Sequence, residues 1–382
     1  MSKSIYLDNA ASTPPDPKVE SALIKFNRTS WGNPASQHNF GGRVLKVLDQ
    51  ARETIAEFLG AKFTEIIFTS GATEANNLAI RGVIDASEIK RPHIITSSIE
   101  HQSVLEPCRT LQKKGAIELT EIEPDQNGKH QVKQFVEAIK SNTVLISLML
   151  VNNELGVINP VRELGKRIQK INENRKIKII FHCDVAQAIQ YLNCRADYLK
   201  TDLLTLSAHK IYGPVGIGVL YIRSRINLKP ILTGGSQEFG LRAGTVNVAG
   251  AIGLSQAIRD LSKNQAKRII KLREEFERGL KRALLGVRII GQDDDRTGIS
   301  NVFFPKLNSQ ILVIALDRAG VAASSGAACE AGAAAESHVA AAINRKNMPG
   351  ANVRFSFGKF NTEAEIKLAV KIIAQTVRGL IK

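Results

Sequence analysis

The feature that most constrains the fold is an alternation of short apolar runs with longer segments of helical periodicity, which extends over residues 42–222. The apolar runs have the length of strands and lie at Ile66–Thr69, Ile94–Ser97, Val144–Leu150, Ile177–Cys183, Leu203–Ser207 and Gly218–Ile222. Between them, apolar residues recur at three- and four-residue spacings in Gly42–Leu59, Thr73–Ile84, Lys133–Lys140 and Val161–Asn172. This alternation predicts a layered α/β fold with a largely parallel sheet between helices.

From about Val246 the pattern changes, and a long charged, periodic stretch from Leu254 to Leu280 predicts one or two surface helices. The elements expected after it are strands at Ile299–Phe304 and Val353–Phe357 and helices at Ser309–Ala319 and Glu363–Ile381. We therefore expect a smaller α+β domain, formed by residues 1–14 and 259–382, beside a large domain of residues 15–258.

The chain has 382 residues and a formal net charge of +16, a balance that favours acidic partners or nucleic acid as transient contacts. The basic residues are scattered without an arm or repeat, so a solvated basic surface is the favoured interpretation and direct nucleic-acid binding is not expected. No apolar run approaches the roughly 20 residues that span a bilayer, and the first residues lack an apolar signal region. We expect a cytoplasmic protein without a membrane partner.

The four cysteines, Cys108, Cys183, Cys194 and Cys329, are too few for a disulfide scaffold and include no C-x-x-C pair. His182 with Cys183 and Cys194 could be considered as metal ligands. A core cysteine in a strand followed by an unrelated cysteine is the favoured alternative, so no metal site is predicted.

Polar residues follow several predicted strands at the point where each strand ends. Lys210 ends Ser207–Lys210, and a lysine amine there can form a Schiff base if it is desolvated, although an exposed loop lysine is the alternative. Asp184 could pair with a protonated pyridine nitrogen or serve as a helix N-cap. Ser70–Glu74 could form an anion site at a helix start, or an ordinary capped helix.

Two further clusters fit the same pattern. His101 could stack on a cofactor ring or transfer a proton, whereas a lone histidine is more often structural. Asn152 and Asn153 offer directed hydrogen bonds, or a turn. Because the carboxyl ends of parallel strands meet at one edge of a sheet, all these groups can converge on one ligand. An anion cradle, a carboxylate, a flat ring, a hydroxyl donor and a lysine together fit pyridoxal 5′-phosphate (PLP).

Nine motifs stand in order along nearly the whole chain: Tyr6–Ala11, Gly32–Ser36, Thr69–Glu74, Glu100–His101, Val151–Glu154, Ser207–Pro214, Arg242–Thr245, Ser324–Cys329 and Val353–Gly358. With these motifs the chain resembles cysteine desulfurases of the NifS/IscS type, in the class V branch of the fold-type-I PLP enzymes. The resemblance implies a large domain with a mostly parallel, seven-stranded sheet between helices and a smaller α+β domain that carries the Cys329 loop.

The resemblance also assigns roles to individual residues. It implies that Lys210 forms the Schiff base with PLP, that Cys329 accepts the sulfur, and that His101 stacks on the ring and moves protons. The remaining cofactor contacts that it implies are Asp184 at the pyridinium, Gln187 and Asn153 at the ring hydroxyl, Ala72, Thr73, Ser207 and His209 at the phosphate, and Thr245 reaching the phosphate from the other subunit. Arg354 and Asn33 are the substrate-binding residues that it implies.

The activity that the resemblance implies is removal of sulfur from L-cysteine, which gives L-alanine and a persulfide on Cys329. The expected partners are a second copy of the chain and a sulfur-acceptor protein, either an iron–sulfur scaffold or a thiolation enzyme. The alternative is another class V enzyme, such as a selenocysteine lyase or an aminotransferase, and an aminotransferase needs no Cys329.

Overall fold

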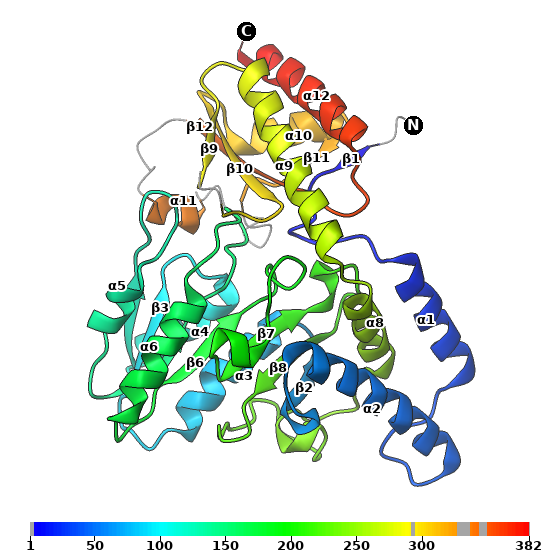
Figure 1. Ribbon diagram of the computed structural model, residues 1–382, viewed down its shortest axis with the longest axis vertical. Helices are drawn as coiled ribbons and strands as arrows, with labels where there is room; N and C mark the ends of the chain where they lie inside the picture. The colour runs from blue at the N-terminus through cyan, green and yellow to red at the C-terminus, as the bar shows by residue number, and fades with distance from the viewer. Residues whose placement is uncertain (1–3, 292–294, 327–336, 344–349, 382) are drawn as a thin grey trace.

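The computed structural model describes residues 4–291, 295–326, 337–343 and 350–381, and its largest sheet has seven strands (Figure 1). Their order across the sheet is β2-β8-β7-β6-β5-β3-β4. In chain order they are β2 (Ile66–Thr69), β3 (His93–Ser97), β4 (Glu118–Ile122), β5 (Thr143–Ser147), β6 (Ile180–Asp184), β7 (Leu203–Ser207) and β8 (Gly218–Ile222). The expected seven-stranded sheet between helices is confirmed.

One strand of this sheet runs against the others. β8 is antiparallel to both of its neighbours, β7 and β2, whereas every other pair is parallel. Reversal on both sides of β8 makes β2 run in the same direction as β7. The carboxyl ends of β2, β3, β5, β6 and β7 therefore lie at one edge of the sheet, as the sequence predicts.

Helices cover both faces of the sheet. The helices of this part of the chain are α1 (Pro17–Thr29), α2 (Asn39–Leu59), α3 (Ala72–Ala86), α4 (Gln102–Lys113), α5 (Val132–Glu137), α6 (Val161–Glu173), α7 (Ala196–Leu199) and α8 (Val248–Arg259), with short 3-10 turns at Phe63–Glu65, Ala208–Lys210 and Glu238–Gly240. Ile66 and Phe68 of β2 pack in the cluster that contains buried residues of α2, α6 and α8. Ile67 packs with α3 and α4 instead. This alternation along one strand reflects the two-residue period of its side chains.

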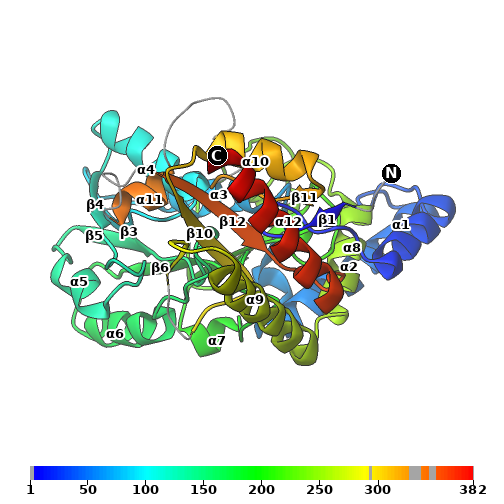
Figure 2. The same cartoon turned by 90° about the horizontal axis from the view of Figure 1, so that it is seen from above.

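A second core lies beyond the edge where those strands end, in the upper part of Figure 1. Its elements are β1 (Ile5–Tyr6), α9 (Lys263–Ala283), β9 (Arg288–Ile290), β10 (Ile299–Pro305), α10 (Ser309–Arg318), β11 (Val321–Ala322), β12 (Gly350–Ser356) and α12 (Glu363–Ile381). The short helix α11 (His338–Ala342) packs in a separate, smaller cluster with Ile99 and Leu155. β10 is the middle strand of an antiparallel sheet with β9 and β12. Figure 2 shows α9 and α12 side by side over this sheet, and the two helices are in contact.

The N-terminal segment belongs to both parts of the molecule. β1 pairs in parallel with β11, so Ile5 and Leu7 are buried in the second core. The chain then runs to α1, where Val19 is buried in the first core (Figure 1). Residues 7–16 therefore pass the edge of the large sheet where the polar clusters lie.

Some helices differ from the sequence prediction. The stretch from Leu254 to Leu280 covers the second half of α8 and most of α9, but α8 is buried against α1 and α2 rather than exposed. Periodicity identifies one apolar face, and the glycines and alanines on the other faces of α8 let two neighbours approach closely. The helices α1 and α4 lie outside the sequence prediction, and α4 holds Pro107, a residue that opposes a helix interior.

Several boundaries also shift. The strand expected over Ile177–Cys183 is β6, Ile180–Asp184, and the one expected over Val144–Leu150 ends at Ser147 as β5.

Among the residues described, no helix is both long and apolar enough to cross a membrane.

Candidate active site

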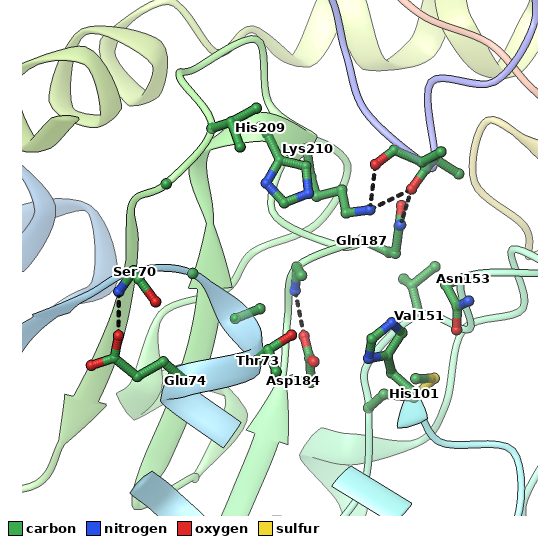
Figure 3. A pocket seen from close by; sticks show the side chains of 18 of the residues that line it. Ser70, Thr73, Glu74, His101, Val151, Asn153, Asp184, Gln187, His209 and Lys210 are labelled. Atoms are coloured by element: carbon green, nitrogen blue, oxygen red, sulfur yellow. Dashed lines mark hydrogen bonds between the residues drawn. The ribbon is translucent and has the colours of Figure 1, made fainter. Parts of the chain in front are cut away.

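A cavity of about 410 Å³ opens at the edge of the large sheet where β2, β3, β5, β6 and β7 end (Figure 3). The residues that line it are Ala10, Ala11, Ser70, Gly71, Ala72, Thr73, Glu74, His101, Met149, Val151, Asn153, Asp184, Ala186, Gln187, His209, Lys210, Val215, Gly216 and Arg354. Figure 3 shows Lys210 across the cavity from Asp184, with Ser70 and Glu74 on one side and His101 and Asn153 on the other. The polar clusters predicted at the strand exits therefore meet at one site.

The start of α3 forms one wall of the cavity. Its N-cap residue is Gly71, which has no side chain. The first N–H groups of the helix, at Ala72 and Thr73, therefore receive no hydrogen bond from an N-cap side chain. A Cβ atom on Gly218 would lie 2.7 Å from the backbone of Gly71, so glycine in β8 allows the sheet to approach this turn. Backbone N–H groups at a helix start favour an anion, and a phosphate group fits there.

His209 lies at the same cavity, next to Lys210. Its Nδ1 is 2.9 Å from the Oγ of Ser207, which is buried and does not line the cavity. Burial lowers the pKa of His209 to about 4, and the charge of Lys210 also lowers it. A neutral imidazole can donate a hydrogen bond from one nitrogen while the other accepts one.

Asp184 ends β6 with its carboxylate at the floor of the cavity and is only 7% exposed. Its Oδ2 accepts a hydrogen bond from Asn76 Nδ2 at 2.8 Å, and its Oδ1 accepts one from the N–H of Ala186 at 2.9 Å. These neutral donors orient the carboxylate and supply no positive charge. A buried carboxylate favours a cationic partner, and a pyridinium nitrogen fits this position.

His101 is the N-cap of α4, and its imidazole is tied to Asp184 through two residues that sequence reasoning missed. Its Nδ1 accepts from the N–H of Ser103 at 3.1 Å and lies 2.7 Å from Ser103 Oγ. Asn76 Nδ2 donates to that same Oγ, at 2.8 Å, as well as to Asp184. Burial, the largest effect, lowers the pKa of His101, whereas the charge of Asp184 raises it. Asn76 carried no signal in the sequence beyond its place one turn into α3.

The amine of Lys210 contacts the N-terminal segment. Lys210 Nζ donates hydrogen bonds to the carbonyl oxygens of Ala10 at 2.7 Å and Ala11 at 2.8 Å. Gln187 Nε2 donates to the same carbonyl of Ala10 at 2.8 Å (Figure 3). The predicted lysine and glutamine thus meet at backbone atoms of Ala10 and Ala11, which side-chain patterns do not predict.

Arg354 lies in β12 and reaches the cavity from the second core. It is 2% exposed, and its Nη1 donates to the carbonyl oxygen of Asn153 at 3.1 Å. Its Nη2 donates to Asp8 Oδ1 at 2.9 Å. The side-chain oxygen Oδ1 of Asn153 is buried without a hydrogen-bond partner among the described residues. The site therefore holds a buried guanidinium and an unpaired amide oxygen at its wall.

The structure does not bring every predicted residue to the cavity. Asn33 is exposed in the α1–α2 connection, where its Oδ1 accepts from the N–H of Ala35. Thr245 lines a separate cavity of about 90 Å³, although Ser70 and Gly216 line both. Cys329 lies outside the described residues. Ser324, upstream of it in the same motif, is bonded by its backbone to Arg354 in both directions, at 3.1 and 2.7 Å.

The other cysteines are poor nucleophiles. Cys108, Cys183 and Cys194 are all buried and unpaired. Burial raises the pKa of Cys194 to about 12 and also raises the pKa values of Cys108 and Cys183. No group of three or more His, Cys, Asp or Glu in the described part of the chain could hold a metal ion.

The chain matches known proteins over nearly its whole length. The family model for class-V aminotransferases matches residues 5–368. A cysteine desulfurase IscS of Dictyoglomus turgidum is 38% identical over 386 residues, which cover 100% of this chain and 96% of that protein. Two solved structures also match. A NifS-like protein has a TM-score of 0.90 and 32% identity, covering 98% of this chain and 100% of that one. SspA in complex with cysteine has a TM-score of 0.81 and 34% identity, covering 94% and 100%. The chain thus belongs to the class-V aminotransferase family, as one of its NifS/IscS-type cysteine desulfurases.

Proposed function

We propose that this protein is a PLP-dependent cysteine desulfurase, which converts L-cysteine to L-alanine and leaves the sulfur as a persulfide on Cys329. The observation that carries the proposal is the placement of Lys210, Asp184 and the start of α3 around one cavity with Arg354 at its wall. The similarity to IscS and NifS-like proteins over the whole chain selects the desulfurase among class V reactions.

The residues present fit PLP. The N–H groups at Ala72 and Thr73, with His209, would hold its phosphate. Asp184 would pair with the ring nitrogen, and Gln187 and Asn153 would face the ring hydroxyl. His101 would stack on the ring. When bound, this group supplies an electron sink that makes both loss of the α-proton and Cβ–S cleavage accessible.

The chain's own residues bind the substrate and move protons. Arg354 would hold the carboxylate of cysteine, since a guanidinium matches a carboxylate with two parallel hydrogen bonds. Lys210 Nζ, once it no longer holds the cofactor, is the candidate proton carrier at the substrate α-carbon, with His101 as the second. His101 suits that task because burial lowers the pKa of its imidazole and so favours the neutral form, which can accept a proton.

Cys329 would act as the nucleophile in its thiolate form. It attacks the substrate sulfur, so an S–S bond forms while the Cβ–S bond breaks. The electron pair of the broken bond stays with the carbon skeleton, which takes up a proton and leaves as alanine. Overall, cysteine and one thiol become alanine and one persulfide, so atoms and electrons balance without an added oxidant.

Two related reactions would use much of the same site. An aminotransferase would keep Lys210 and Asp184 but would not need Cys329, and a selenocysteine lyase would prefer the selenium substrate. The test is to incubate the PLP-loaded protein with L-cysteine, with L-selenocysteine, and with L-alanine plus a keto acid. We expect alanine and transferable sulfur from cysteine. Amino-group exchange without alanine release from cysteine, or turnover of selenocysteine alone, would replace the proposal.

We further propose that the protein is a cytoplasmic homodimer whose persulfide passes to an iron–sulfur scaffold or a thiolation enzyme. Residues 15–258 would form its large domain, and residues 1–14 with 259–382 its small domain. The position of Leu254 in the first core and Ile269 in the second supports a boundary between α8 and α9.

A mixing experiment tests the shared site that a homodimer implies. Thr245 is exposed and lies outside the main cavity of its own chain, which fits a contact made across a subunit boundary. Lys210→Ala and Thr245→Ala proteins, each impaired alone, should regain activity when mixed, because one site of each hybrid has both native residues. Activity that stays at the average of the two separate proteins would contradict a role for Thr245 in the partner's site.

Arg354→Ala should raise the KM for L-cysteine far more than it lowers PLP binding. Losing a buried, charge-assisted contact to the carboxylate costs about 2–4 kcal/mol, roughly a thirtyfold to several-hundredfold rise. Arg354→Lys keeps the positive charge but loses the planar fork of N–H donors. Its KM for L-cysteine should therefore lie between the KM of the native protein and that of Arg354→Ala. Steady-state kinetics on PLP-loaded protein check this, and a normal KM in Arg354→Ala would remove the assignment.

A further inference from the structure

Asp8 lies beside β12, the strand that carries Arg354. Asp8 forms a parallel bridge with Ser356, and the N–H of Ser356 donates to the carbonyl oxygen of Leu7 at 2.7 Å. Residues two apart on a strand share a face, and so do residues opposite one another on paired strands. Arg354, Ser356 and Asp8 therefore present their side chains on the same face. The register of this short pairing accounts for the contact of Asp8 Oδ1 with Arg354 Nη2 at 2.9 Å.

This contact gives a buried positive charge its partner. The side chain of Arg354 is 2% exposed, and a buried guanidinium is costly unless an anion pairs with it. Asp8, whose side chain is 19% exposed, forms that ion pair. Nη1 donates to the carbonyl of Asn153, so Asp8 and Asn153 together fix the plane of the guanidinium from two sides.

The guanidinium keeps donors for a second partner, because only two of its five N–H groups are used in the contacts with Asn153 and Asp8. Arg354 Nε is buried and has no hydrogen-bond partner among the described residues, and Arg354 lines the cavity. An arginine offers five N–H donors in a rigid fork, so a second carboxylate can bind while Asp8 stays in place. Two carboxylates would then share one positive charge, and their mutual repulsion would weaken the second.

We propose that Asp8 is a positioning residue that orients Arg354 and, as a permanent counter-charge, lowers the affinity of the site for the carboxylate of an amino-acid substrate. The inference rests on the proposed function in taking Arg354 as the carboxylate ligand and, for its test, in the binding of PLP at the cavity. Asp8 thereby sets the KM for the substrate without touching the reacting atoms, and it keeps the guanidinium aligned before substrate enters.

Asp8→Asn separates charge from orientation. The amide oxygen of asparagine still accepts a hydrogen bond from Nη2, whereas the negative charge is gone. We expect the dissociation constant for L-alanine to fall by about threefold to tenfold, as removing one nearby like charge predicts at a partly buried site. The constant for ethylamine, which has an amine but no carboxylate, should not change.

Both constants are measured on PLP-loaded protein from the change in cofactor absorbance on adding L-alanine or ethylamine. Asp16→Asn is the matched control, because it removes the same charge from the same segment, where Asp16 pairs with Lys359 away from the cavity lining. An unchanged or raised constant for L-alanine in Asp8→Asn would overturn the proposal. Equal changes for both ligands would also overturn it, because the effect would not act through the carboxylate.

Arg354→Lys and the double variant Asp8→Asn/Arg354→Lys test whether Asp8 acts through the guanidinium. If Asp8 acts through the guanidinium, Asp8→Asn should have a much smaller effect on L-alanine binding in the Arg354→Lys background, and additive effects would contradict the coupling. The dissociation constants for L-alanine and ethylamine can be measured whether or not the protein removes sulfur from cysteine. Failure to release alanine from cysteine, with the Asp8 effect intact, would reject the proposed reaction alone. Alanine release without the Asp8 effect would reject this inference alone.

Discussion

Cys329→Ala is expected to lower alanine release from L-cysteine by at least about a thousandfold, while PLP and cysteine still bind. Cβ–S cleavage by this route needs a thiolate to take the sulfur, and thiolate rather than thiol is the nucleophile. Cys108, Cys183 and Cys194 cannot substitute, because they are buried and their pKa values are raised. The measurements are the rate of alanine formation and the absorbance change of the bound cofactor on adding cysteine.

Cys108→Ala is the matched control for this variant. Cys108 is buried in the core between α3, α4 and the sheet, so its loss changes stability rather than the reaction. It should retain turnover near that of the native protein. Near-normal alanine release by Cys329→Ala, with the cofactor bound, would show that Cβ–S cleavage does not need Cys329 and would favour a lyase.

Lys210→Ala is expected to remove the visible absorption of covalently held PLP and to abolish turnover, a loss of at least about a thousandfold. Lys210 Nζ is the lysine amine at the cavity that Asp184 and the start of α3 also line. PLP added to the variant should bind without a covalent bond and leave on dialysis, because Asp184 and the N–H groups of α3 remain.

Lys229→Ala serves as the control, since Lys229 is exposed and does not line the cavity. Borohydride reduction followed by peptide mass analysis should place PLP on the Lys210 peptide in the native protein and in this control. An unchanged visible spectrum in Lys210→Ala, or a label on a different lysine, would move the cofactor attachment elsewhere.

The convergence of the site could be predicted from the sequence because it depends on local signals. Each polar cluster follows a short apolar run, and strands of one direction deliver their carboxyl ends to one edge. Asp184, Lys210, His101 and Asn153 therefore line one cavity as expected. β8 runs the other way, but β2 on its far side does not, so Ser70–Thr73 still reaches the same edge.

Contacts between distant segments could not be predicted in this way. The carbonyls of Ala10 and Ala11 meet Lys210 only because β1 pairs with β11 and draws the N-terminal segment past the sheet. Every residue has a backbone carbonyl, so side-chain patterns in the sequence cannot indicate which carbonyl accepts a hydrogen bond. The pairing of Asp8 with Arg354 depends in the same way on the register between residue 8 and β12.

Other assignments depend on the family resemblance and stay predictions. Asn33 and Thr245 lie away from the main cavity of one chain, and no local signal at either residue indicates what it would contact. The burial of α8 was missed for a related reason. Periodicity marks the face that is apolar, but it does not say how many neighbours the other faces meet.

The most direct test of sulfur transfer is to locate the sulfur. The PLP-loaded protein is incubated with L-cysteine carrying isotopically labelled sulfur, without reductant, and its peptides are analysed by mass. We predict one labelled sulfur atom on the peptide containing Cys329, released by reductant and matched by one alanine for each labelled subunit. Labelled sulfur on Cys108, Cys183 or Cys194 instead, or alanine without any label on the protein, would contradict the account.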